Sequence, residues 1–123
     1  MDIPSNVQEI TANEFESCIA ENEIVVVDFW AKWCAPCKNF AKTFANIAIK
    51  YSQITFAKVD IEQQPELAEA FEIRSIPHLM VFKQGIVIYS ESGSMPDSTL
   101  QELVEQALNA DVSAIAAQIE SDN

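Results

Sequence analysis

Four stretches of the chain have the apolar pattern of β-structure. The first, Ile24–Trp30, is β-branched and aromatic at nearly every position, and Thr55–Val59 is a second buried run. A strand that is apolar on both sides is covered on both faces, so we predict that the first is a central strand. Leu79–Lys83 and Ile86–Ser90 are β-rich runs separated by Gln84-Gly85, which predicts a hairpin with antiparallel strands.

Four other segments show the 3.6-residue apolar spacing of amphipathic helices, and they begin near Ala12, Ala35, Pro65 and Pro96. The first should end near Ala20, because Thr11 and Glu14 form a capping box at its start. The second should be long and extend to Tyr51. Strands that alternate with helices and end in a hairpin indicate an α/β fold with a mixed sheet.

The chain has 123 residues, an ordinary size for a single domain. We assign residues 1–109 to this domain. Residues 110–123 are alanine-rich, with Val112, Ile115 and Ile119 at roughly helical spacing. This C-terminal extension is compatible with a helix and with a frayed tail.

The charge is strongly negative, with a net value of −12, and all seven basic residues lie between Lys32 and Lys83. This distribution opposes binding to nucleic acid and to anionic membrane surfaces. The first ten residues carry acidic residues and a proline where an export signal would have basic residues and an apolar run. No apolar stretch is long enough to span a bilayer. We therefore expect a cytoplasmic protein.

Cys34 and Cys37 stand at the predicted junction between the central strand and the long helix. The positive end of a helix favours a thiolate, so Cys34 is the candidate nucleophile and Cys37 can resolve a mixed disulfide. Paired cysteines can also bind zinc, but only Cys18 and His78 remain as further soft ligands. Cys18 is explained as an apolar residue of the first helix, and we predict no metal site.

Residues 27–38, Val-Asp-Phe-Trp-Ala-Lys-Trp-Cys-Ala-Pro-Cys-Lys, closely resemble the active-site segment of the thioredoxin family. Ile73–Pro77, Phe82–Gly85 and Gly93 are similar to further segments of that family, and the resemblance extends from about Val7 to Leu108. It implies a thioredoxin-like fold, in which a central mixed five-stranded sheet is flanked by four helices.

The resemblance also implies roles for residues outside the cysteine pair. Pro77 would be cis and would face the dithiol. Asp28 interrupts an apolar strand, where a carboxylate costs several kcal/mol unless it is paired or protonated. By resemblance it accepts the proton of Cys37, with Lys58 as its electrostatic partner. An Asp at the polar end of a strand, without a chemical role, is the alternative.

An apolar surface around Cys34 would bind substrate proteins, and the residues expected in it are Trp33, Ala35, Pro36, Ile76, Pro77, His78 and Gly93. Trp30 is expected to support the core, although either tryptophan could serve packing alone.

Three positions depart from the family pattern. Ala35 replaces a common glycine and should stiffen the first helical turn. Lys42 stands where a proline usually kinks the helix, which predicts a straighter helix. His78 replaces a threonine and could contact substrate, tune Cys34, or simply face solvent.

The predicted function is that of a protein-disulfide reductase that helps to keep cytosolic thiols reduced. Its expected partners are disulfide-containing proteins and thioredoxin reductase, which would supply electrons from NADPH through a flavin. We expect a monomer without a bound cofactor, since the chain lacks a glycine-rich dinucleotide loop. An oxidant or isomerase of the same fold and a non-enzymatic binding module are the alternatives. The absence of a histidine between the cysteines favours the reductant.

Overall fold

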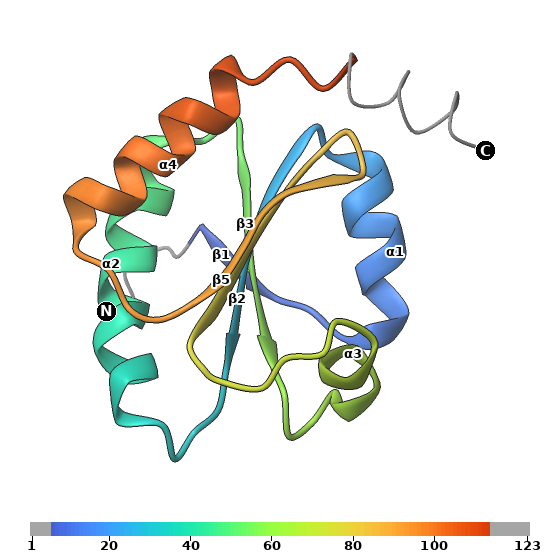
Figure 1. Ribbon diagram of the computed structural model, residues 1–123, viewed down its shortest axis with the longest axis vertical. Coiled ribbons are helices and arrows are strands. Elements are labelled where there is room, and N and C mark those ends of the chain that lie inside the picture. The colour runs from blue at the N-terminus through green and yellow to red at the C-terminus, as the bar shows by residue number, and fades with distance from the viewer. Residues whose placement is uncertain (1–5, 114–123) are drawn as a thin grey trace.

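The computed structural model describes residues 6–113, and its centre is a five-stranded mixed sheet (Figure 1). The strands are β1 (Val7–Glu9), β2 (Ile24–Trp30), β3 (Thr55–Asp60), β4 (His78–Lys83) and β5 (Ile86–Ser92). Their order in the sheet is β1-β3-β2-β4-β5. β2 pairs in parallel with β3 and antiparallel with β4, so the predicted central strand is confirmed.

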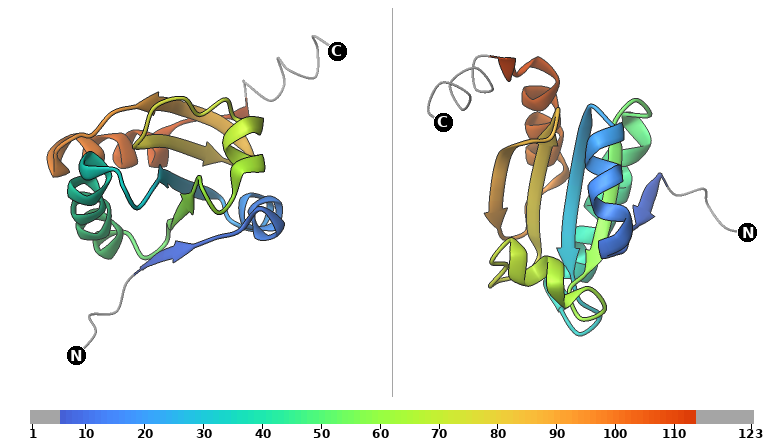
Figure 2. Two further views of the ribbon diagram at one scale, coloured as in Figure 1. Left: turned by 90° about the horizontal axis from the view of Figure 1, so that it is seen from below. Right: turned by 90° about the vertical axis from the view of Figure 1, so that its right-hand side faces the viewer.

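Four helices cover the two faces of this sheet, and they are α1 (Ala12–Glu21), α2 (Ala35–Lys50), α3 (Pro65–Ala70) and α4 (Asp97–Asn109). α2 and α4 lie on one face, and α1 and α3 lie on the other (Figures 1 and 2). The starts predicted from the apolar spacing agree with the structure, except that Pro96 caps α4 rather than opening it. The predicted α/β fold, with five strands and four helices, is confirmed.

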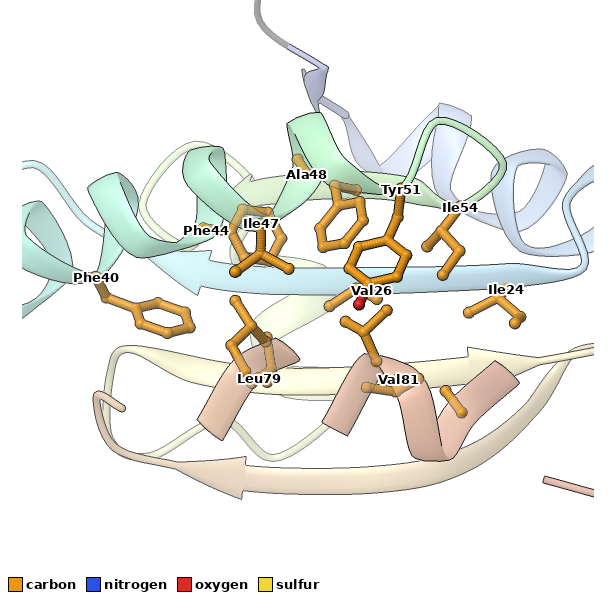
Figure 3. Close-up of a cluster of buried hydrophobic side chains, with 14 residues drawn as sticks. Ile24, Val26, Phe40, Phe44, Ile47, Ala48, Tyr51, Ile54, Leu79 and Val81 are labelled. Atoms are coloured by element: carbon orange, nitrogen blue, oxygen red, sulfur yellow. The ribbon is translucent and has the colours of Figure 1, made fainter. Parts of the chain in front are cut away.

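Alternation along β2 divides the core into two clusters, because successive side chains of a strand point to opposite faces. Val26 packs with Phe40, Phe44 and Ile47 of α2 and with residues of β4 and α4 (Figure 3). Phe29, on the other face, packs with residues that include Phe15 of α1. Both clusters are almost free of solvent contact, so β2 is held rigidly and fixes the position of the segment that follows it.

The hairpin between β4 and β5 turns at Gln84 and Gly85, whose φ angles are +52° and +78°. Two successive residues with positive φ are typical of the tightest hairpin turns, and glycine adopts that conformation without strain. The antiparallel pairing predicted for these strands is confirmed, with a register shift between Val81 and Phe82.

A buried lysine joins the end of β4 to the end of α4. Nζ of Lys83 donates hydrogen bonds to the carbonyl oxygens of Ala107 (2.7 Å), Leu108 (3.0 Å) and Ala110 (2.7 Å). Val112 is only 2% exposed. Contacts with the domain therefore continue beyond Asn109, while most of the predicted extension lies outside the described residues.

Candidate functional site

The cysteine pair lies where β2 ends and α2 begins. Cys34 caps α2, and its Sγ accepts a hydrogen bond of 3.2 Å from the backbone amide of Cys37. The two residues form a disulfide, with their Cα atoms 5.2 Å apart. Because Cys34 sits at the positive end of the helix, the helix dipole and that amide stabilise a thiolate there once the disulfide is reduced.

The segment before β4 packs against the first of these cysteines. Sγ of Cys34 lies 3.8 Å from the carbonyl oxygen of Ile76, and the peptide bond between Ile76 and Pro77 is cis, as expected. The amide of Gly93 donates a hydrogen bond of 2.8 Å to the carbonyl oxygen of Pro77. The segment of Ile76 and Pro77 therefore links Cys34 on one side with Gly93 on the other.

Asp28 is buried in the middle of β2 and is 2% exposed. Its Oδ1 has no hydrogen-bond partner among the described residues. Burial raises the pKa of Asp28 from an ordinary 3.8 to about 7, and the positive charge of Lys58 only partly opposes that shift. A carboxyl group with this pKa can exchange a proton near neutral pH.

A cavity of about 270 Å³ connects Asp28 with the second cysteine. Its lining consists of Asp28, Trp30, Ala31, Lys32, Cys37, Lys38, Ala41 and Lys58. Asp28 and Cys37 therefore line the same cavity. A proton transfer between them would require such a shared space. Lys32, Lys38 and Ala41 were not predicted as site residues from the sequence, although Lys38 and Ala41 lie one and four residues after Cys37, within one helical turn.

Lys58 stands beside Asp28 in the register of β2 and β3. Its ammonium group lies 4.9 Å from the ring centroid of Trp30, a distance typical of a cation–π contact. Trp30 in turn packs against the cluster of Ala31, Cys34 and Cys37. Trp30, which was expected to support the core, therefore also lies next to the dithiol.

The residues predicted for the substrate surface differ in exposure. Trp33 is 66% exposed, and the chain around the disulfide is also open to solvent at Ala35, Pro36 and Gly93. Ile76 is half-buried and packs against the two cysteines. The exposed and half-buried residues together leave Cys34 at the edge of an accessible, largely apolar surface.

His78 begins β4 and is half-buried. Its Nε2 forms a hydrogen bond of 2.8 Å with Oγ of Ser90, and its ring meets that of Phe29 edge to face at 6.2 Å. Burial lowers the pKa of His78, while the charge of Glu91 opposes this. Since Phe29 belongs to the cluster beneath α1, the imidazole lies on that face of the sheet. Its partner in the structure is Ser90.

Residues 6–113 contain no group of three or more metal-ligating side chains. Cys18 lies on α1, half-buried, and packs against the apolar cluster beneath that helix. The pKa of its thiol is raised, mainly by burial. Within the same described range, no helix has the length and apolar character needed to cross a membrane.

A disulfide at the start of a helix, packed against an Ile-cis-Pro segment on a mixed sheet, defines a thiol-disulfide oxidoreductase. The family model named Thioredoxin matches residues 6–106. The chain belongs to the thioredoxin family, and it is a disulfide reductase of the thioredoxin type.

Individual relatives agree with this assignment. The chain is 39% identical over 87 residues to a thioredoxin of Mycoplasma pneumoniae, covering 71% of this chain and 85% of that protein. It is 36% identical over 97 residues to thioredoxin-1 of Saccharomyces cerevisiae, covering 79% and 94%. A solved structure of Plasmodium falciparum thioredoxin superposes with a TM-score of 0.75 at 37% identity, covering 80% of this chain and 97% of that one.

Proposed function

We propose that Cys34 attacks the disulfides of substrate proteins and that Cys37 completes their reduction. The thiolate of Cys34 displaces one substrate sulfur as a thiolate and forms a mixed disulfide. The thiolate of Cys37 then attacks Sγ of Cys34 and releases the second substrate sulfur. Two electrons pass to the substrate, and the disulfide between the two cysteines closes. The observation that carries this proposal is the position of that disulfide at the start of α2.

Asp28 is the proposed acceptor for the proton of Cys37. The thiol must lose this proton before it can attack, and Asp28 lines the same cavity as Cys37. A base works best when its pKa is close to the working pH, and the pKa of Asp28 is raised to about 7. Lys58 limits that rise through its positive charge, so it acts by adjusting Asp28.

Substrate chains would dock on the surface beside Cys34. The backbone of Pro77 and the exposed side chain of Trp33 are the main candidates for contact, with Ala35, Pro36, Ile76 and Gly93 around them. His78, which is hydrogen-bonded to Ser90, is a further candidate for contact with the substrate at the end of this surface. Flexible, extended segments fit such an edge best, because their backbone is free to pair.

Reducing equivalents would come from thioredoxin reductase, which takes them from NADPH through its flavin. The dithiol is the only redox group that this chain would need, so we propose that it works without a bound cofactor. We further propose that residues 1–109 form the catalytic domain, that the protein is a monomer and that it acts in the cytoplasm.

A coupled assay tests the proposed chemistry. Wild-type protein should accelerate the reduction of insulin by NADPH and thioredoxin reductase. Cys34→Ser and Cys37→Ser should each abolish this acceleration, whereas Cys18→Ser should retain it, because Cys18 lies on α1 outside the site. Full activity in Cys34→Ser would show that the proposed nucleophile is wrong.

A further inference from the structure

The basic residues of this acidic protein gather beside the dithiol. Three of its seven basic side chains, Lys32, Lys38 and Lys58, line the cavity that Cys37 also lines. Lys42 follows Lys38 by four residues on α2, so both lie on the same face of that helix. We call Lys32, Lys38 and Lys42 the lysine patch.

The lysine patch has no partner for its charges among the residues that the structure describes. All three side chains are exposed, and none forms an ion pair or a side-chain hydrogen bond with any of residues 6–113. Two other lysines are already engaged. Lys83 is bound to three backbone carbonyl groups, and Lys50 donates a hydrogen bond to Gln101.

Acidic groups are scarce in the cavity beside the patch. Among the described residues, Asp28 is the only acidic one in the cavity lining, and its raised pKa leaves it only partly ionised near neutral pH. Glu9 stands in register with Lys58 and so faces that lysine rather than the patch. The patch is therefore a positive region of about three charges on a protein whose net charge is −12.

The position of the lysine patch indicates a role in substrate binding rather than in stabilising the core. Cys34 contacts Ile76, and Cys37, three residues later, lines the lysine-rimmed cavity. A substrate whose disulfide reaches Cys34 would carry its flanking residues toward Ile76, toward the side of the cavity, or toward both. Residues that fall on the cavity side would meet exposed ammonium groups.

We propose that the lysine patch binds carboxylate side chains that flank the target disulfide, so that the protein prefers disulfides in acidic segments of its protein substrates. This inference rests on the proposed function of the dithiol. At physiological ionic strength the Debye length is about 8 Å, so a nearby patch acts on a docked segment more strongly than the distant negative charges do. The preference therefore concerns residues next to the disulfide, and the total charge of the substrate matters less.

Three synthetic peptides provide the test. They share one sequence with one intramolecular disulfide, and they differ only in flanking residues, which are all Asp, all Asn or all Lys. Second-order rate constants for their reduction are measured with fully reduced wild-type protein, with the variant Lys32→Gln/Lys38→Gln/Lys42→Gln, and with Lys50→Gln. Lys50 is the matched control, because it is an exposed lysine of the same helix outside the patch.

Wild type should reduce the Asp peptide about fivefold faster than the Asn peptide at about 0.1 M salt, and the Lys peptide more slowly than either. The ratio of Asp to Asn rates should fall toward one at about 1 M salt, where the Debye length is about 3 Å. It should also fall toward one in the triple variant and persist in Lys50→Gln.

Several results would overturn the inference. Equal rates for the Asp and Asn peptides with wild type would exclude a carboxylate preference. Fastest reduction of the Lys peptide would mean that the overall negative charge governs selection. An unchanged ratio in the triple variant would remove the patch as its cause. The neutral Asn peptide separates this inference from the function on which it rests. If none of the three peptides is reduced, the Asn peptide included, the proposed dithiol chemistry itself is wrong.

Discussion

Replacing Asp28 with asparagine should stabilise the protein at alkaline pH. Asparagine has nearly the shape of a protonated aspartic acid, and it cannot ionise. The folded protein holds the Asp28 proton up to a pKa of about 7, whereas the unfolded chain releases it near 3.8. A difference of about three pH units corresponds to about 4 kcal/mol, at about 1.4 kcal/mol per unit.

The sign of the pH dependence follows from the raised pKa. Between about pH 4 and 7 the folded state binds more protons than the unfolded state, so wild-type stability falls as the pH rises through this window. The gain from Asp28→Asn should therefore be close to zero at about pH 4 and should approach 4 kcal/mol above about pH 8.

Urea denaturation of the disulfide form, followed by tryptophan fluorescence, measures this gain at each pH. Asp60 is the matched control, since it is also an aspartate at a strand position and is 3% exposed. Its Oδ1 accepts hydrogen bonds from the amides of Glu62 (2.9 Å) and Gln63 (3.4 Å), so Asp60→Asn should not stabilise the protein at any pH. Equal gains for Asp28→Asn at about pH 4 and above about pH 8 would refute the reasoning.

Three further predictions concern the contacts of α4, and each is measured by urea denaturation. Lys83→Met should lower the free energy of unfolding by about 2–3 kcal/mol, because three buried or partly buried carbonyl groups lose a charged donor; a loss below about 0.5 kcal/mol would contradict this. A chain ending at residue 113 should be more stable than one ending at 109 by about 2 kcal/mol, because the longer chain keeps the buried Val112 and the Ala110 carbonyl; equal stability would contradict it. Tyr51→Phe should cost about 1 kcal/mol by removing the 2.6 Å hydrogen bond that Tyr51 donates to Glu105, and the cost should disappear when Glu105 is already replaced by Ala, which leaves no acceptor.

The main elements of the fold could be predicted because their signals are local. β2 is apolar on both faces, α2 has a long 3.6-residue period, and Gln84-Gly85 marks the hairpin. These elements also place the dithiol, since Cys34 ends the short connection between β2 and α2 and Cys37 lies in the first turn of α2. The strand β1 has no such signal. It is three residues long and largely exposed, and its structure depends on pairing with β3.

Other features of the site arise only when distant segments meet. The cavity joins residues of β2, β3 and α2, and the neighbouring positions of Asp28 and Lys58 were expected only from the family resemblance, because the two residues are distant in sequence. The contact of His78 with Phe29 and its hydrogen bond with Ser90 depend on the pairing of β4 with β2 and β5. The bonds of Lys83 to the end of α4 likewise depend on the packing of α4 against the sheet.

Trapping of the mixed disulfide tests the central claim most directly. In Cys37→Ser the resolving thiol is absent, so a disulfide-containing substrate should remain covalently attached after attack by Cys34. Mass spectrometry of the digested adduct should locate the bond at Cys34, and Cys34→Ser should form no adduct. An adduct at Cys18, or none in Cys37→Ser, would contradict the account.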